Sequence, residues 1–354
     1  MFQVIVMWNF TRPDQELNEI VNNIRLRGYN EDTFLTGEFA WKLAEEKIRP
    51  LSVSDISDKY CPTRRDLYFK KGIRRLSKQW RKGEDTWGST VGTLVESYII
   101  NIFTTSRTSD SRTSENPNYN YIVDISERNY NNFMDRNKRF IERLEELEKR
   151  QPEEKGNTQW LKKLLKSGGR AELALNYLNE LLRDDISITK DDILTGNSAK
   201  IDASSEEMRF DKIKQIGINL PATPDFIIPE YGIVGDIKTG TEFKDHFQLT
   251  CAGYALAYEN VKERGHDINW GIIYFLPTRN PRRFRKSITF AQVYIFPIDD
   301  YLRREFLTKR DEAYAIISKS KRPPLPQPNE RGHCKHCKFK DICIRDGLVL
   351  EVRE

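Results

Sequence analysis

Residues 224–238 read PDFIIPEYGIVGDIK, and this stretch decides the fold. Two apolar runs flank the segment Pro-Glu-Tyr-Gly, a pattern that predicts a β-hairpin. If the hairpin turns symmetrically at that segment, Asp225 lies opposite Asp236. Residues two apart in a strand share a face, so Lys238 points the same way as Asp236. The sequence therefore predicts two carboxylates and one ammonium group together on one face of a sheet.

This grouping suits the hydrolysis of phosphodiesters. Carboxylate oxygens hold Mg²⁺ or Mn²⁺, which polarises a phosphate and lowers the pKa of a bound water. A neighbouring lysine can orient that water or stabilise the developing charge on the phosphate. The alternative is a solvated hairpin with an incidental Asp–Lys pair. The apolar neighbours of Asp236 weigh against that alternative, because burying a charge without a partner or an ion is costly. The residues alone leave both interpretations open.

The flanking segments predict an α/β core. Apolar residues at helical spacing predict a helix over Glu84 to Phe103. The same kind of pattern predicts two further helices, over Glu242 to Arg264 and Asp299 to Lys321. Trp270 to Leu276 and Ser287 to Phe296 have the composition of strands. Helices that alternate with strands in this order are typical of a sheet covered by helices.

Changes in composition divide the chain into four parts. The predicted parts are an N-terminal helical segment (1–50), a core in two pieces (51–104 and 221–321), a mainly helical insertion (105–220) and a small cysteine-bearing C-terminal subdomain (322–354).

The overall composition favours a soluble protein. Hydrophobic residues make up 38% of the 354 residues and charged residues 31%, and the net charge of +5 argues only weakly for a nucleic-acid partner. No run reaches the roughly 18–20 apolar residues of a membrane span, and residues 1–10 lack the basic leader of a signal peptide. Five cysteines, an odd number, do not suggest a secreted disulfide framework. We therefore expect a cytoplasmic protein that does not bind a membrane.

Four of the cysteines form a candidate metal site: Cys61, Cys334, Cys337 and Cys343. Four thiolates suit either a [4Fe–4S] cluster or tetrahedral zinc. From the spacing alone zinc is the commoner answer, although one isolated cysteine with three clustered ones differs from the usual paired zinc knuckles. His333 and His336 could compete as zinc ligands. Cys251 lies among apolar residues of a predicted helix, so we expect it to be a buried core residue.

Two basic stretches are candidates for contact with DNA. Arg64 to Lys82 holds nine lysines and arginines among nineteen residues, with Tyr68, Phe69 and Trp80 interleaved. Cations suit backbone phosphates and aromatic rings can stack on single-stranded bases, but a helical surface with a buried aromatic stripe explains the pattern as well. In that case Tyr68 and Phe69 belong to the core. Arg279 to Lys286 forms a second basic patch on a predicted hairpin loop.

These motifs resemble a known nuclease family. Pro224-Asp225 followed by Asp236-Ile237-Lys238 is similar to the PD-(D/E)XK nuclease motif, and Gln248 resembles the Gln of its RecB-like branch. Glu96 matches an upstream helix position where that branch often has His. Residues 61–69, CPTRRDLYF, are similar to the start of the CRISPR-associated RecB-like exonucleases, and the three C-terminal cysteines resemble those of the iron–sulfur members. The resemblance covers about 51–103 and 222–343.

The resemblance implies a restriction-endonuclease-like core with an iron–sulfur subdomain, in a larger archaeal-type subfamily. The implied metal ligands for Mn²⁺ or Mg²⁺ are Glu96, Asp225 and Asp236; Lys238 is implied to be catalytic, and Gln248 to position the substrate or the lysine. The four cysteines Cys61, Cys334, Cys337 and Cys343 are implied to hold a [4Fe–4S] cluster.

The implied function is a metal-dependent DNA exonuclease that acts on single strands or overhangs. It would process spacer precursors in CRISPR adaptation together with the CRISPR integrase proteins. Two alternatives stay open: a non-catalytic DNA-binding or scaffold subunit, and a RecB-like nuclease of recombination or of a virus. The sequence departs from the family at Glu96, which replaces His, and at Ala252, which stands where the family has Tyr. The oligomeric state is left open.

Overall fold

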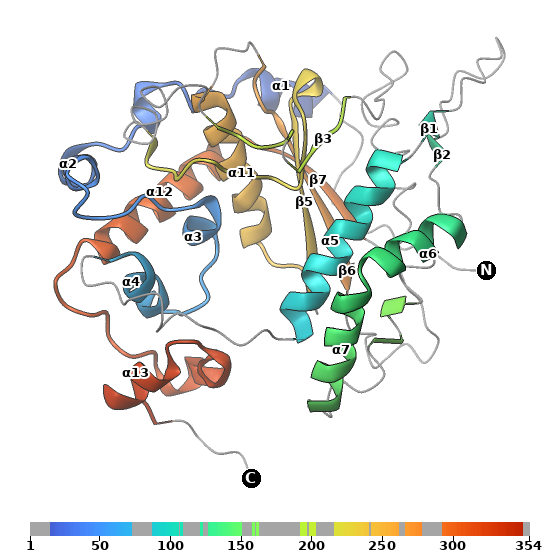
Figure 1. Cartoon of the computed structure of the whole chain (residues 1–354). Helices are drawn as coiled ribbons and strands as arrows, with labels where there is room; N and C mark the ends of the chain where they lie inside the picture. Colours follow the sequence, from blue (N-terminus) through green and yellow to red (C-terminus); the bar gives the residue numbers. More distant parts are fainter. Residues whose placement is uncertain are drawn as a thin grey trace.

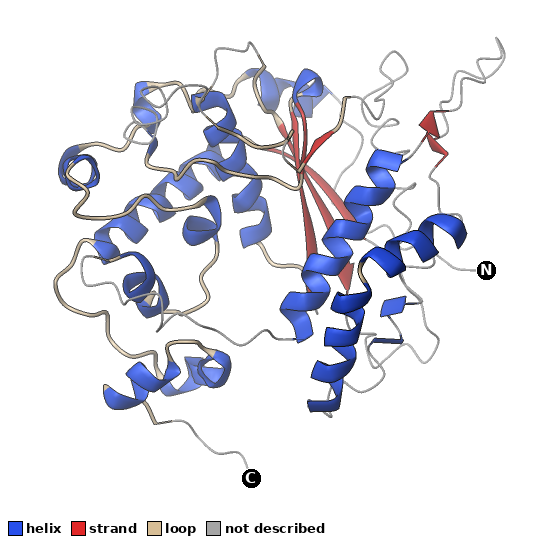
Figure 2. Ribbon diagram, in the orientation of Figure 1, coloured by secondary structure: helices blue, strands red, loops and turns tan. Residues whose placement is uncertain are grey.

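A five-stranded sheet forms the centre of the computed structural model, and helices flank it on both sides (Figures 1 and 2). The structure describes residues 15–72, 87–105, 107–108, 121–122, 127–150, 158–159, 161–162, 192–196, 198–202, 216–240, 242–261, 266–277 and 292–349. The strands, in their spatial order, are β3 (Leu194–Thr195), β4 (Phe226–Ile228), β5 (Ile233–Gly240), β6 (Trp270–Pro277) and β7 (Gln292–Pro297). Only β5 and β6 are parallel, because helix α11 (His246–Asn260) carries the chain back between them.

The predicted hairpin is confirmed in its register. Phe226 of β4 lies opposite Gly235 of β5, so Asp225, one residue before the strand, is in line with Asp236. A 3-10 turn followed by Gly232, at φ 64°, closes the hairpin. The ring of Phe226 covers Gly235 so closely that a Cβ there would lie 1.9 Å from it. Glycine at this position therefore lets the ring pack across the two strands.

Each face of the sheet carries its own hydrophobic core. Helices α5 (Trp87–Thr105), α6 (Glu127–Arg136) and α7 (Lys138–Arg150) pack on one face, against side chains that include Ile233 and Ile237. Helices α3 (Val53–Ser57), α11 and α12 (Asp300–Ile317) pack on the other (Figure 1). Val234 belongs to the core on the α11 face. Since alternate strand residues share a face, Asp236 and Lys238 also face α11.

The remaining described elements lie around this core. They are α1 (Gln15–Asn22), η1 (Glu31–Thr33), α2 (Gly37–Ala44), α4 (Arg65–Lys71), β1 (Arg107–Thr108), β2 (Tyr121–Ile122), η5 (Pro229–Tyr231), η6 (Pro328–His336) and α13 (Lys340–Arg345). Strand β3 comes from the predicted insertion and nevertheless pairs with β4. Much of that insertion lies outside the described residues. None of the helices in the described ranges is both long and apolar enough to cross a lipid bilayer.

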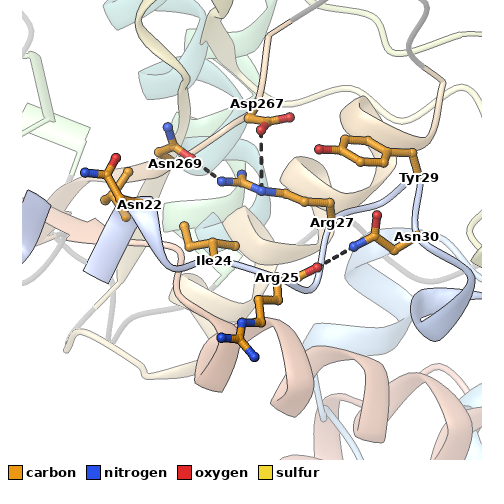
Figure 3. Close-up of a pocket in the computed structure, with 9 residues that line it drawn as sticks. Asn22, Ile24, Arg25, Arg27, Tyr29, Asn30, Asp267 and Asn269 are labelled. Atoms are coloured by element: carbon orange, nitrogen blue, oxygen red, sulfur yellow. Dashed lines mark hydrogen bonds and ion pairs between the residues drawn. The ribbon is translucent and has the colours of Figure 1, made fainter. Parts of the chain in front are cut away.

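The segment after α1 lines an open pocket of about 520 Å³ beside the start of β6 (Figure 3). Its base is the guanidinium of Arg27, whose Nη2 lies 2.9 Å from Asn269 Oδ1 and whose Nε lies 3.5 Å from Asp267 Oδ2. The Arg27 guanidinium is therefore already paired with Asn269 and Asp267. The pocket lies toward the C-terminal end of α11, away from the predicted carboxylates.

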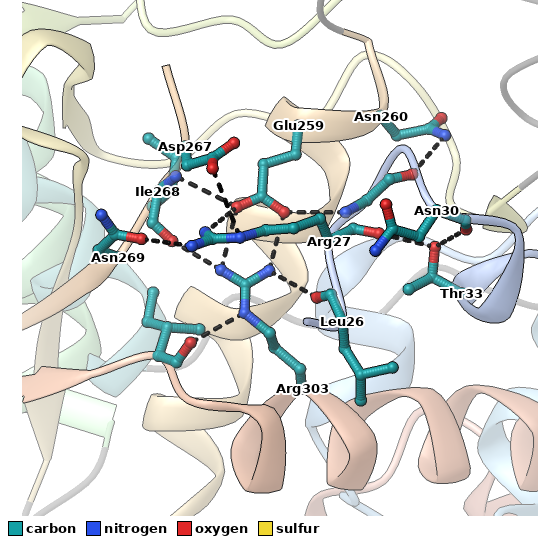
Figure 4. Close-up of polar contacts among 12 residues, drawn as sticks. Leu26, Arg27, Asn30, Thr33, Glu259, Asn260, Asp267, Ile268, Asn269 and Arg303 are labelled. Carbon is teal, nitrogen blue, oxygen red and sulfur yellow. Dashed lines mark hydrogen bonds and ion pairs between the residues drawn. The ribbon is translucent and has the colours of Figure 1, made fainter. Parts of the chain in front are cut away.

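A buried polar network lies behind this pocket and joins three segments of the chain (Figure 4). Glu259 of α11 and Arg303 of α12 are both fully buried, and their side chains make two hydrogen bonds of 2.8 and 3.0 Å. Glu259 also accepts from Arg27 Nη1 at 2.9 Å and from the Gly28 N–H at 2.8 Å. The network fixes the C-terminal end of α11 against α12 and the N-terminal segment.

Candidate active site and cysteine cluster

The structure brings the predicted carboxylates and lysine together on the α11 face of the sheet. Asp236 is only 1% exposed, and its Oδ2 lies 2.6 Å from Lys238 Nζ. The Oδ2 atom of Asp225 accepts a hydrogen bond of 2.5 Å from the Ile237 N–H, which fixes the Asp225 side chain across the hairpin from Asp236. The buried Asp236 carboxylate is thus paired with Lys238, two residues further along the same strand.

Glu96 reaches the same group from α5. Helix α5 approaches β5 closely at Gly92, where an added Cβ would lie 3.3 Å from Thr239 Oγ1. One turn later the Glu96 side chain hydrogen-bonds with Asp225 and lies within electrostatic range of Asp236 and Lys238. Glu96, which stands where the resembled family often has His, therefore supplies a carboxyl group to the site.

The charges of this group are out of balance. Burial raises the pKa of Asp225 well above its ordinary value, and the charges of Asp236 and Glu96 raise it further. Burial also raises the pKa of Glu96, while Lys238 opposes the rise. Burial alone would lower the pKa of Lys238, but Asp236 and Asp225 outweigh it and raise the value. Three carboxyl groups share one ammonium group. Carboxylate oxygens of this kind are the ligands that divalent cations such as Mg²⁺ and Mn²⁺ bind.

Helix α11 adds two side chains to this site that sequence reasoning did not assign. Burial raises the pKa of Tyr254, and Asp236 and Asp225 raise it further, so the phenol lies within range of the carboxylates. His246 lies within range of Lys238 and Asp236, and its Nε2 is 3.9 Å from Asp58 Oδ1. A single His at the start of a helix is not part of any sequence motif, so no sequence signal points to His246.

Gln248, also in the first turn of α11, is half-buried between the buried Phe247 and Leu249. The structure places it on the helix that covers the carboxylates, as predicted, and its role stays a prediction. Cys251 is fully buried and its thiol points to the Ile272 carbonyl, so the prediction of a core residue is confirmed.

The four remaining cysteines line one small cavity between α4 and the C-terminal segment. They are Cys61, Cys334, Cys337 and Cys343. All but Cys337 are buried. The Phe339 N–H donates a hydrogen bond of 3.5 Å to Cys337 Sγ, and the Thr63 hydroxyl lies 3.4 Å from Cys61 Sγ. Residues far apart in the sequence are thus assembled into one thiol-lined site.

Burial raises the pKa of the Cys337 thiol to about 11, and it raises the pKa values of Cys334 and Cys343 as well. The free thiols of Cys334, Cys337 and Cys343 are therefore protonated at neutral pH. A bound metal favours the thiolate form instead, because its charge replaces the missing solvent. The four thiols of the cavity are the donor type that a thiolate-bound metal group needs, although no three His, Cys, Asp or Glu side chains in the described ranges are arranged to hold a metal ion.

Aromatic and ionic contacts attach α4 to the cysteine-bearing C-terminal segment. The rings of Phe69 and Phe339 lie 5.4 Å apart, and Tyr68 and Phe69 are fully buried, which confirms them as core residues. The buried Arg65 guanidinium donates to the Asp346 carboxylate and to the Pro323 carbonyl. The Cys61 segment and the final cysteines thus belong to one packed unit.

The described part of the first basic stretch is structural. Arg64 is buried and donates to the backbone carbonyls of Asp55 and Ile56. Lys70 and Lys71 pair with Asp55; burial would raise the pKa of Asp55, but these two ammonium groups lower it to about 2. The DNA-binding interpretation does not apply to these cations. Residues 73–82 and the second basic patch, 279–286, lie outside the described residues.

Comparisons with known proteins agree with the motifs. Residues 207–345 match the family described as CRISPR-associated exonuclease Csa1. The protein named CRISPR-associated exonuclease Csa1 from Saccharolobus solfataricus is 30% identical over 119 residues, which is 34% of this chain and 36% of the relative. The match thus spans about a third of that relative's length. No solved structure matches the chain. The family range includes the carboxylate hairpin and the last three cysteines, whereas Glu96 and Cys61 precede it.

Proposed function

We propose that this chain, whose residues 207–345 match the family described as CRISPR-associated exonuclease Csa1, is itself a metal-dependent DNA exonuclease. The observation that carries this proposal is that Glu96 from α5 hydrogen-bonds with Asp225 and lies within electrostatic range of the Asp236–Lys238 pair. A restriction-endonuclease-like core is the fold that this arrangement supports.

Each residue of the group has a proposed task. Glu96, Asp225 and Asp236 would hold Mn²⁺ or Mg²⁺, which when bound polarises the scissile phosphate and lowers the pKa of the attacking water. Lys238 is held beside Asp236 and would stabilise the charge that develops on the phosphate, or orient the water. Gln248, from the covering helix, would position the DNA or the lysine.

The proposed substrate is single-stranded DNA or a single-stranded overhang. The support is the resemblance of the motifs and the CRISPR association in the family name. In such a setting the product would be trimmed spacer precursors, and the partners would be the CRISPR integrase proteins.

The first test is digestion of DNA by the wild-type chain. Linear single-stranded DNA labelled at either end, circular single-stranded DNA and blunt duplex would be incubated with Mn²⁺, with Mg²⁺ or with a chelator. We expect the linear single strand to be shortened from an end in the presence of Mn²⁺ or Mg²⁺, and no cutting with the chelator. Cutting of the circular strand would replace the exonuclease assignment with an endonuclease, and no cutting of any substrate would contradict the proposal.

We further propose that Cys61, Cys334, Cys337 and Cys343 hold a [4Fe–4S] cluster, as the shared cavity and the family resemblance support. The cluster would be structural and would connect two segments that are distant in the chain. Closing so long a loop stabilises the fold by about 4–5 kcal/mol, by analogy with a disulfide.

Replacing Cys334 by Ala should therefore remove the cluster and destabilise the protein. Anaerobically purified wild type should absorb near roughly 400 nm and contain on the order of four irons per chain, whereas Cys334→Ala should contain almost none. Cys251→Ala is the matched control, since Cys251 is buried but lies outside the cavity and should keep its iron. A colourless wild type that contains zinc would overturn the cluster and leave the exonuclease proposal intact.

A further inference from the structure

His246 occupies a particular place at the candidate active site. It is the first residue of α11, and only the five residues 241–245 separate it from the end of β5. Its ring packs edge-on against Phe247, at 4.8 Å between ring centroids, and is half-buried. The charged groups within its electrostatic range are Asp58, Lys244, Lys238 and Asp236. The imidazole thus lies within electrostatic range of two residues proposed for the active site, Asp236 and Lys238, and of Asp58.

Asp58 comes from the segment that leads to Cys61. Arg64 donates a hydrogen bond to the Asp58 carbonyl, and this contact holds the loop between α3 and α4 in place. The Asp58 carboxylate projects toward α11, where its Oδ1 lies 3.9 Å from His246 Nε2. The cysteine-bearing segment therefore contributes a charged group to the surroundings of the candidate active site.

A second contact fixes the same two elements. The buried hydroxyls of Ser57 and Thr250 lie 3.0 Å apart, and the Thr250 hydroxyl donates to the His246 carbonyl at 3.2 Å. Helix α3 and the first turn of α11 are thus joined at neighbouring positions. The position of His246 depends on the loop before Cys61 through both contacts.

We propose that His246 is a further catalytic residue, whose imidazole N–H donates a hydrogen bond to a phosphate oxygen of the DNA, and that the charge of the nearby Asp58 carboxylate, which is not hydrogen-bonded to the ring, positions it. This inference rests on the proposed exonuclease function. An imidazole N–H beside a phosphate stabilises the charge that develops when the phosphodiester is attacked. It also gives the cysteine site a role in catalysis, because the segment that carries Cys61 holds Asp58 against the active site.

The test compares single substitutions under steady-state conditions on a labelled single strand. His246→Ala should lower kcat at least about tenfold with KM changed less than about twofold, because the lost hydrogen bond acts mainly in the transition state. His246→Asn and His246→Gln keep an N–H donor, and at least one of them should recover part of the rate. His266→Ala is the matched control, since His266 is exposed and precedes β6 at the other end of α11. Iron content and the thermal midpoint should be the same in all of them.

The role of Asp58 is tested by a double-mutant cycle. Asp58→Asn should lower kcat about threefold or more in the wild type and should have no further effect in His246→Ala, because the effects of residues that act as a unit do not add. Full additivity, or wild-type kcat in His246→Ala while Asp236→Ala is inactive, would overturn the inference and leave the exonuclease in place. Absence of cutting by the wild type would overturn both.

Discussion

Asp236→Ala should lower the cutting of single-stranded DNA on the order of 10³-fold, which corresponds to about 4 kcal/mol in the activation barrier. The Asp236 carboxylate is buried beside Lys238 and faces Asp225, so its removal takes away a proposed metal ligand and the ion partner of the lysine together. Losing one such electrostatic group in an enclosed site typically costs 10²–10³-fold in rate. Rates measured in Mn²⁺ on an end-labelled strand, at saturating DNA, provide the comparison.

The control for this prediction is Asp32→Ala, which removes an exposed carboxylate from η1 and should leave the rate unchanged. Asp236→Ala should also bind Mn²⁺ more weakly, whereas its iron content should equal that of the wild type. If Asp236→Ala cut DNA as fast as the wild type, the carboxylate group would not be the active site. If neither protein cut DNA but both bound it, the chain would be a scaffold subunit.

The hairpin that carries this site was predictable because its rules are local. A turn segment between two apolar runs sets which residues face each other, and the period of two in a strand sets which of them share a face. The register of Phe226 opposite Gly235 follows from those rules, as does the grouping of Asp225, Asp236 and Lys238.

The remaining parts of the site depend on tertiary contacts that leave no local signal. His246 and Asp58 meet only because α3 and α11 pack together, and Tyr254 reaches the carboxylates from two positions beyond Ala252, where the family has its Tyr. The first basic stretch was in part misread as a DNA-binding surface, because the number of lysines and arginines does not reveal that Arg64 and Arg65 are buried. Local rules therefore succeed within the hairpin, and the contacts of more distant elements were anticipated only where the family resemblance supplied them, as for Glu96 and the four cysteines.

Glu259 is the clearest case of such a long-range contact, and Glu259→Ala should lower the free energy of unfolding by about 3–5 kcal/mol. The carboxylate is fully buried and accepts hydrogen bonds from Arg303 and from Arg27, which lies 232 positions away in the sequence. Truncating it leaves two buried guanidinium groups without their shared anion, together with the unpaired N–H groups of Gly28 and Ile268. The cost is large because desolvated charges and donors lose their partner at once.

Glu305→Ala supplies the control on the neighbouring helix α12. Glu305 is 39% exposed and 3.9 Å from Lys309, so breaking this surface pair should cost about 0.5 kcal/mol or less. Thermal unfolding followed by circular dichroism should show a fall on the order of 10 °C for Glu259→Ala and almost none for Glu305→Ala. Equal midpoints would mean that water replaces the Glu259 carboxylate at little cost. In that case the network would not be what holds the end of α11 against α12 and the N-terminal segment.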